Sequence, residues 1–568
     1  MIVTTSCPGI LALVVSVAIF ASLAFAEPLV TLRNGTYEGL YAPSFHQDHF
    51  LGIPYAQDAG GKNRFLIPQP LNATWEGSRP AKQYGHACPD ASPKTDAVWG
   101  MSENCLSINV VRPADVGCNE SLPVLFWIHG GSYQEGTSAL YNLSYIVQRS
   151  VDIGRPVVAA SINYRKGAWG NLYSIEIQGS GNTNLALRDM RQALSWVQEN
   201  IAAFGGDPGR VTIWGESAGS FAVGQLLMSY GGRSDGLFHR SIQESGSAAT
   251  AWYNGTEWYQ PIYNKIVGQV NCSEAIDTLE CLRTVPYEIL YPFMNSSVLA
   301  GPGCYPTVDG DVIPNYPTTL LHEGRFAHIP HLYGTNSDEG TDNAPTGVIN
   351  TDDDLYKFLL NSTGFGFPPA TVREVMRLYP DDPSQGVPIN TGSERFAEKG
   401  EQYKRIAAIM GDVFYHAPRQ DDARHYAKHQ PDNTFIYRFN TRGFVKANST
   451  TPGAVCINNI CGTLKPAYKG VAHATELAFV FNVPDQTGPW PEYRDLANDI
   501  SAMWINFAHD GNPNGPGAEV TWPPYSTGPD GANLVLQTKS QGGMYVEADT
   551  YRLQGREYLT KWARRRHV

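Results

Sequence analysis

Short apolar runs alternate with an amphipathic segment in the first half of the chain. Residues 122–128 and 156–162 are nearly continuous apolar runs, and residues 211–214 form a short β-branched run. Between them, apolar side chains recur at steps of three and four residues from 187 to 201, so they line one face of a helix. Residues 205–208, Gly-Gly-Asp-Pro, end that helix. This alternation predicts a parallel sheet covered by helices on both faces.

After residue 250 the pattern loosens. Segments rich in Asn, Pro and Gly separate helices expected at 396–410 and 495–507, and strand-like runs at 330–333 and 435–439 extend the same sheet. No repeat of 20–50 residues and no low-complexity linker divides the chain. We therefore predict one large α/β domain at residues 27–568, with excursions that cover one end of the sheet.

The first 26 residues predict a cleaved secretory signal peptide. They contain no Asp, Glu, Lys or Arg, residues 10–25 are apolar, and Ala24-Phe25-Ala26 has the small-x-small pattern of a cleavage site. The alternative is a transmembrane anchor, but the run is short for a full span. The basic C-terminus is unlike the tail of a GPI-anchored protein. We expect a secreted protein without a stable membrane anchor.

Composition narrows the class of protein further. The 568 residues are 42% apolar and 11% aromatic, which is ample for a large core and argues against disorder. The net charge of −12 repels phosphate backbones, so nucleic acid is not an expected partner. The sequence gives no indication of the oligomeric state.

Sequons and cysteines agree with secretion. Without Cys7, eight cysteines remain, an even number as expected in an oxidising compartment. Their spacing suggests the local pairs Cys88–Cys105, Cys272–Cys281 and Cys456–Cys461, and leaves Cys118 and Cys304 unassigned. We predict no metal site and no cofactor. Nine Asn-x-Ser/Thr sequons are candidate glycosylation sites: Asn34, Asn72, Asn119, Asn142, Asn254, Asn271, Asn295, Asn361 and Asn448.

A nucleophile-elbow pattern, Gly-x-Ser-x-Gly, follows the strand at 211–214 and opens a helix. Its residues are 215–219, with Ser217 at the centre. Glycines flank the serine because side chains there would collide with the adjacent strand and helix. The hydroxyl is thereby raised above the sheet, beside free backbone N–H groups that can hold negative charge. We predict that Ser217 is a nucleophile; the alternative is a tight structural turn.

A second glycine turn, His129-Gly130-Gly131-Ser132, directly follows the strand at 122–128. Glycine lets backbone N–H groups approach a substrate oxygen closely. We predict that the N–H groups of Gly131, Ser132 and Ala218 form an oxyanion hole. The alternative is a glycine turn that binds no ligand.

These and further motifs resemble the type-B carboxylesterase/lipase family, which includes fungal lipases and cholinesterases. Residues 184–189, 196–201, 204–208 and 211–220 match its central signature, and residues 103–109 match its upstream signature. The resemblance extends from about residue 30 to residue 562. It implies an α/β-hydrolase fold and ester hydrolysis through an acyl-enzyme.

The resemblance also implies the other two members of a catalytic triad. The order in α/β-hydrolases is Ser, acid, His. Chemistry alone favours neither Asp338 nor Glu339 clearly as the acid of the triad. The family pattern favours Glu339. The family pattern selects His473 among the six histidines that follow, which are His416, His425, His429, His473, His509 and His567.

Four further residues match supporting positions of the family. Glu216 and Ser245 correspond to residues that buttress the triad, and Arg64 and Glu103 to a buried structural ion pair.

The chain also departs from the family pattern. Ser132 stands where a third glycine is common, which narrows the site toward small acyl groups. Only 16 residues lie between Cys88 and Cys105, where the lipases of the family carry a longer lid, so we expect an open site. Trp99 in this loop is not at the cholinesterase spacing, and packing of the loop explains it as well, so we infer no choline substrate from it.

Taken together, the sequence predicts a secreted serine carboxylesterase that acts on small-molecule or lipid-like esters. One alternative is a true lipase on long-chain acylglycerols. Another is a non-catalytic binding protein on the same fold, which retention of Ser217, Glu339 and His473 disfavours.

Overall fold

The computed structural model describes residues 27–117, 119–250, 253–294, 303–361, 366–527 and 530–566. The predicted signal peptide at 1–26, Cys118, Asn295 and His567 lie outside the described residues. Across the described ranges, no helix has both the length and the hydropathy that a membrane crossing requires.

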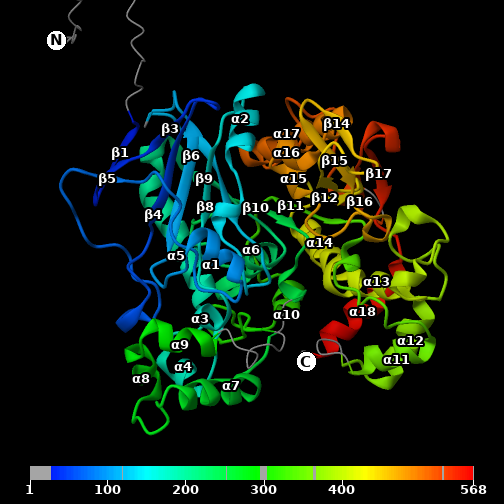
Figure 1. Ribbon diagram of the computed structural model, residues 1–568, viewed down its shortest axis with the longest axis horizontal. Coiled ribbons are helices and arrows are strands. Elements are labelled where there is room, and N and C mark those ends of the chain that lie inside the picture. The colour runs from blue at the N-terminus through cyan, green and yellow to red at the C-terminus, as the bar shows by residue number, and fades with distance from the viewer. Residues whose placement is uncertain are drawn as a thin grey trace, which may run out of the picture.

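An eleven-stranded sheet forms the centre of the molecule (Figure 1). Its middle is parallel, and antiparallel strands flank it at both edges, which confirms the predicted largely parallel sheet. In spatial order the strands are β17 (Tyr545–Ala548), β16 (Ala532–Leu536), β12 (Thr434–Phe439), β11 (His331–Asn336), β10 (Arg240–Glu244), β9 (Gly206–Glu216), β7 (Leu122–Ile128), β8 (Val158–Ile162), β6 (Ser107–Pro113), β4 (Gln47–Pro54) and β3 (Leu40–Ala42).

Helices bury both faces of this sheet. Every residue of β7 is buried, and its side chains alternate between two hydrophobic clusters. Val124, Phe126 and Ile128 pack against α5 (Leu185–Asn200) and α6 (Ala218–Met228). Leu125 and Trp127 pack with α2 (Ser144–Asp152) and α17 (Pro491–Asp510) on the opposite face. Burial on both faces explains why the sequence of β7 is continuously apolar.

Helical excursions extend from the sheet. One contains α7 (Thr256–Gln269), α8 (Thr278–Thr284) and α9 (Tyr287–Met294), and the other α11 (Asp352–Asn361), α12 (Pro369–Leu378) and α13 (Tyr403–Gly411). The single helix expected at 396–410 is wrong: Ala397–Lys399 form a 3-10 turn, and α13 begins only at Tyr403. Gly400 breaks the run, because it has φ +117° and a Cβ there would lie 2.8 Å from the Ile349 carbonyl.

Two other expected boundaries shift. The helix expected at 495–507 lies inside the longer α17. Gly206 to Pro208, expected in a turn, belong to β9, which starts five residues earlier than the β-branched run suggests.

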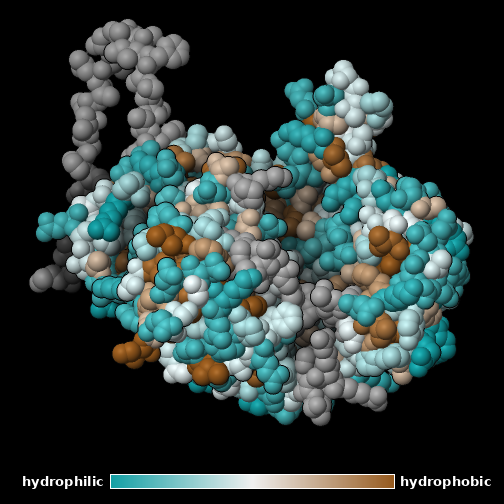
Figure 2. Space-filling model, turned by 60° about the horizontal axis from the view of Figure 1, so that its bottom comes forward, coloured by the Kyte–Doolittle hydropathy of each residue, from teal (hydrophilic) through white to brown (hydrophobic). Residues whose placement is uncertain are grey.

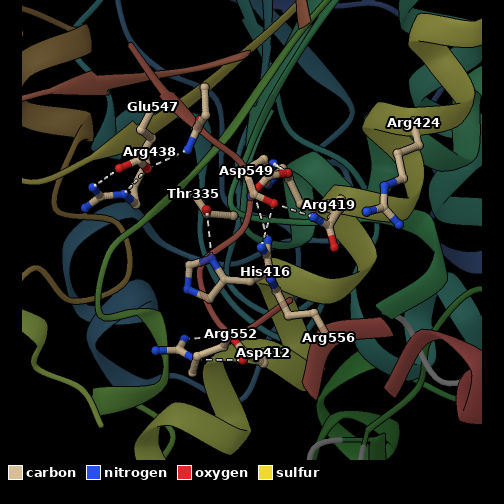
Figure 3. Close-up of polar contacts among 12 residues, drawn as sticks. Thr335, Asp412, His416, Arg419, Arg424, Arg438, Glu547, Asp549, Arg552 and Arg556 are labelled. Carbon is tan, nitrogen blue, oxygen red and sulfur yellow. Dashed lines mark hydrogen bonds and ion pairs between the residues drawn. The ribbon is translucent and has the colours of Figure 1, made fainter. Parts of the chain in front are cut away.

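Buried ion pairs fix the last helix, α18 (Leu553–Arg566), to the rest of the excursion (Figure 3). Arg419 on α14 (Ala417–His429) donates to both oxygens of Asp549, at 2.7 and 2.9 Å, and Arg556 of α18 donates to the same carboxylate at 2.8 Å. Arg552 binds Asp412 through two hydrogen bonds of 2.8 and 2.6 Å. Asp412 begins the π-helical turn η10 (Asp412–His416), which joins α13 to α14.

Three disulfides form at the locally expected pairs, Cys88–Cys105, Cys272–Cys281 and Cys456–Cys461. Within the described residues Cys304 is a free, buried thiol. Six of the eight described sequon asparagines are exposed, and two, Asn34 and Asn254, are partly buried.

Candidate active site

Ser217 occupies a sharp turn between β9 and α6. Its backbone has φ 56° and ψ −123°, outside the regions that L-residues ordinarily adopt, and its N–H donates to the Glu244 carbonyl at 2.9 Å. The flanking glycines are required sterically: a Cβ on Gly219 would lie 2.1 Å from the Ile128 carbonyl, and one on Gly215 would lie 2.5 Å from the backbone of Gly219. The serine side chain is partly exposed.

The glycine turn after β7 lies against this elbow. A Cβ on Gly130 would be 3.1 Å from Ser217 Cβ, and one on Gly131, at φ +99°, would be 2.1 Å from the Glu135 carbonyl. Gly131 accepts hydrogen bonds from the N–H groups of two following residues, so the chain folds back on itself. The backbone N–H groups of Gly131, Ser132 and Ala218 donate no hydrogen bond to any other described residue. They are therefore available as donors.

A buried ion pair holds the far end of this glycine loop. Lys166 Nζ donates to Asp90 Oδ2 at 2.8 Å and also to the carbonyl of Gly136, whose own N–H donates to Asp90 Oδ2 at 3.2 Å. The Lys166 and Asp90 side chains are 1% and 0% exposed. Burial lowers the pKa of Lys166, and the Asp90 carboxylate opposes that shift.

This anchor links the Cys88–Cys105 loop, which carries Asp90, to the glycine loop that follows β7. The sequence analysis missed it. Lys166 directly follows Arg165 in the sequence, so the local pattern gave no signal for a buried lysine.

The structure shows which of the two neighbouring carboxylates, Asp338 or Glu339, contacts His473. Glu339 Oε2 lies 2.7 Å from His473 Nδ1, and Glu339 Oε1 accepts the N–H of Asn336 at 2.7 Å. Asp338 instead accepts the backbone N–H groups of Ile389 and Val471, each at 2.8 Å, and burial raises its pKa to about 6. Glu339 therefore faces the imidazole, and Asp338 fixes the loop that carries it.

His473 lies on the loop before α15 (Leu477–Val480), and its ring packs on Tyr415 of η10 with a centroid distance of 4.7 Å. Its Nε2 is 3.2 Å from Glu216 Oε1. Burial alone would lower the pKa of His473, but the carboxylates of Glu216 and Glu339 outweigh it and raise the pKa. The Ser217 hydroxyl makes no hydrogen bond to any described residue, and the polar contact of Nε2 is with Glu216.

More buried carboxylates surround the imidazole than the sequence predicted. Ser245 Oγ donates to Glu476 at 3.2 Å, and the amide of Asn336 donates to the same carboxylate. Glu244 accepts the indole N–H groups of Trp214 and Trp504, at 2.7 and 2.6 Å. Burial raises the pKa of both Glu476 and Glu244. Glu216 thus contacts His473, and Ser245 contacts Glu476, which lies three positions after His473 and was missed.

The remaining singled-out residues have structural contacts. Arg64 binds Glu103 through two hydrogen bonds of 2.6 and 2.7 Å, and their side chains are 3% and 11% exposed. Trp99 ends α1 (Pro93–Trp99) in the Cys88–Cys105 loop and contacts the ring of Tyr84 at 6.0 Å. These contacts pack the loop.

A serine on the turn after a central parallel strand, an acid after a later strand and a histidine on a later loop define an α/β-hydrolase. The chain belongs to the carboxylesterase family, whose model matches residues 26–553. It is a carboxylic ester hydrolase, and its substrates are small-molecule esters.

Individual relatives agree. The chain is 32% identical to "Lipase 4" of Diutina rugosa, over 97% of each chain. It is 31% identical to "Secreted lipase 1" of Botryotinia fuckeliana, over 94% of this chain and 93% of that one. Its structure is similar to the crystal structure of Aspergillus niger EstA, with a TM-score of 0.79 and 26% identity over 96% of this chain and 99% of that one.

One relative differs in activity. The "Inactive carboxylesterase-like protein VdtD" of Byssochlamys spectabilis is 32% identical over 84% of this chain and 82% of its own. Whether the site residues of this chain act in hydrolysis is therefore worth a direct test.

Proposed function

We propose that Ser217, Glu339 and His473 are the catalytic triad of this esterase, and that the N–H groups of Gly131, Ser132 and Ala218 form its oxyanion hole. His473 removes the proton from Ser217 Oγ as the hydroxyl attacks the ester carbonyl, and then gives that proton to the leaving alcohol. Water attacks the acyl-enzyme by the same route and releases the acid. Glu339 holds the imidazole so that Nε2 is the nitrogen that takes the proton.

The contact between Glu339 and His473 carries this proposal. A fully buried carboxylate 2.7 Å from Nδ1 accepts a hydrogen bond from the Nδ1–H group, so the proton stays on Nδ1 and Nε2 keeps the lone pair that a general base requires. Free N–H donors beside a serine in a strained turn supply the second requirement, stabilisation of negative charge on the carbonyl oxygen.

His473 has to turn from Glu216 toward Ser217 during the reaction. Glu216 is the residue before Ser217, so the acceptor at 3.2 Å and the hydroxyl belong to neighbouring positions of one turn. Hydrogen bonds of catalytic groups commonly tighten only when substrate is bound. We propose that Glu216 binds the imidazole of His473 in the free enzyme. When substrate enters, Nε2 then moves from Glu216 to the hydroxyl of Ser217.

The short Cys88–Cys105 loop supports an esterase rather than a true lipase, since it is packed by Trp99 and anchored through Asp90. On the face in Figure 2, hydrophobic residues form small separate patches among hydrophilic ones, and the surface is hollowed between two lobes. We propose short-chain esters as preferred substrates. Rates on soluble butyrate and on emulsified long-chain esters would test this, and a sharp rate increase on the emulsion would favour the lipase alternative.

We further propose that the protein is a secreted glycoprotein with a single catalytic domain at 27–568. The relative named as a secreted lipase and the exposure of six sequon asparagines support this proposal. Sequencing the N-terminus of the mature protein tests the cleavage after residue 26.

Matched variants test the triad. Ser217→Ala and His473→Gln should each abolish turnover of p-nitrophenyl butyrate, whereas His429→Gln, on α14, should leave it unchanged. Glu339→Gln should reduce kcat by about 10²-fold or more, because it removes the partner that orients the imidazole. A fluorophosphonate probe should add its mass to the peptide that contains Ser217. Turnover retained in Ser217→Ala, or labelling at another residue, would refute the proposal, and no turnover in the unaltered protein would favour a binding role.

A further inference from the structure

Three potential metal ligands converge where α10 (Pro317–His322) meets α14, outside the proposed active site. His322 ends α10, and Asp421 and His425 lie one turn apart on α14. One ligand atom from each residue lies within 4.8 Å of the other two. The sequence analysis predicted no metal site, and His322 and Asp421 are 99 positions apart, so no local spacing indicates this cluster.

The Asp421 carboxylate contacts both imidazoles, whose rings also pack against each other with a centroid distance of 4.1 Å. His322 Nε2 is 3.1 Å from Asp421 Oδ2, and His425 Nδ1 is 3.5 Å from Asp421 Oδ1. Zinc bonds of about 2.0–2.2 Å in a tetrahedron place neighbouring ligand atoms about 3.3 Å apart. The separation of His322 Nε2 from Asp421 Oδ2 matches that spacing, and the 4.8 Å limit on the three ligand atoms requires only a small inward movement of side chains.

A hydrogen bond of His425 fixes which of its ring nitrogens carries the proton. Its Nδ1 is 2.8 Å from the backbone carbonyl of Asp421, and a carbonyl can only accept, so Nδ1 carries the proton. Nε2 then keeps its lone pair. Donation from the second ring nitrogen to a backbone carbonyl is the usual way a metal-binding imidazole is oriented.

Solvent reaches this cluster from one side. The side chains of His322 and His425 are 28% and 18% exposed, and that of Asp421 is 8% exposed. A cation can therefore enter, and water can complete its coordination. Two imidazoles and one carboxylate suit zinc and its neighbours in the first transition row, and do not suit calcium or magnesium, which prefer an all-oxygen shell.

We propose that His322, Asp421 and His425 form a zinc site that joins α10 to α14. The site is structural rather than catalytic, since none of its residues contacts Ser217, Glu339 or His473 among the contacts of the described residues. Bound zinc stabilises the folded chain because the unfolded chain does not hold the three ligands together.

Calorimetric titration of zinc chloride into untagged, chelator-treated full-length protein tests the site. We expect one zinc per chain, no heat from calcium chloride, and an affinity at least about tenfold lower in His322→Ala and in Asp421→Asn. His429→Ala is the matched control: it removes an imidazole from the next turn of α14, outside the cluster, and should bind zinc like the unaltered protein.

Two further measurements keep the test decisive. Zinc should raise the melting temperature of the unaltered protein and of His429→Ala but not that of His322→Ala. Because His322 is partly exposed, that variant should fold and retain its esterase rate without zinc. A chelator should leave turnover unchanged and hasten thermal inactivation. No zinc binding at millimolar concentration, or equal binding by His322→Ala, would overturn the proposal.

Discussion

Replacing Lys166 by methionine breaks the buried ion pair that anchors the glycine loop after β7. Both partners are essentially inaccessible to water, so the change leaves the Asp90 carboxylate buried without its cation. Breaking such a pair costs about 3–5 kcal/mol. Asp90 keeps hydrogen bonds from the N–H groups of Ser92 at 2.8 Å and Gly136 at 3.2 Å, so we expect the lower end, about 3 kcal/mol.

The same size of effect should appear in thermal unfolding. At about 2.1 cal/mol/K per residue, roughly 540 residues have an unfolding entropy near 1.1 kcal/mol/K, so a loss of about 3 kcal/mol lowers the melting temperature by about 3 °C. Asp90→Asn should lower the stability by a similar amount, because it leaves the ammonium group of Lys166 buried without its negative partner. The double variant removes both charges and should lose much less than the sum of about 6 °C.

Turnover gives the functional part of this test. Gly136, which both partners contact, is five residues after Gly131, so loosening it displaces the proposed donors. A displacement near 1 Å can cost up to about 10²-fold in rate, so kcat on p-nitrophenyl butyrate should fall while KM changes little. Strictly additive melting shifts, or an unchanged kcat in Lys166→Met, would refute the anchoring role.

Three other predictions follow from the site and surface. Glu216→Gln removes one of two carboxylates that raise the pKa of His473, so this pKa should fall. Because the base acts when neutral, the acidic limb of the profile of kcat/KM against pH should move to lower pH, and an unchanged limb would contradict the coupling. Gly219→Ala puts a methyl group 2.1 Å from the Ile128 carbonyl. It should lower the free energy of unfolding by about 1–3 kcal/mol, measured by thermal melting, and remove most of the turnover, measured as kcat. Glycosidase treatment of the secreted protein should lower its mass by several glycans, and an unchanged mass would contradict the sequon assignment.

Local pattern was enough to predict five of the eleven strands of the central sheet and the elbow. The runs that became β7, β8 and β12 are apolar because both of their faces are covered, and the glycines of the elbow are needed in any chain that makes this turn. The helix expected at 396–410 failed because one glycine conformation at Gly400, set by contact with Ile349, overrides an otherwise helical pattern.

Contacts between distant segments were beyond prediction from pattern. Asp338 and Glu339 are chemically near-equivalent neighbours, and only the turn after β11 decides which of them faces His473. Lys166 and Asp90 are 76 positions apart and belong to different loops. The resemblance to a family led to the prediction of Glu339 and His473, whereas only the folded structure reveals the ion pair of Lys166 and Asp90.

The ion pairs that secure α18 have a consequence for the order of assembly. Asp549, Arg552 and Arg556 follow His473 in the chain by 76 or more positions, yet they bind Arg419 and Asp412, which flank the turn that packs on the imidazole. Until these residues have been synthesised, that turn lacks its partners. A nascent chain stalled before residue 549 should therefore be inactive even with its serine, acid and histidine already translated.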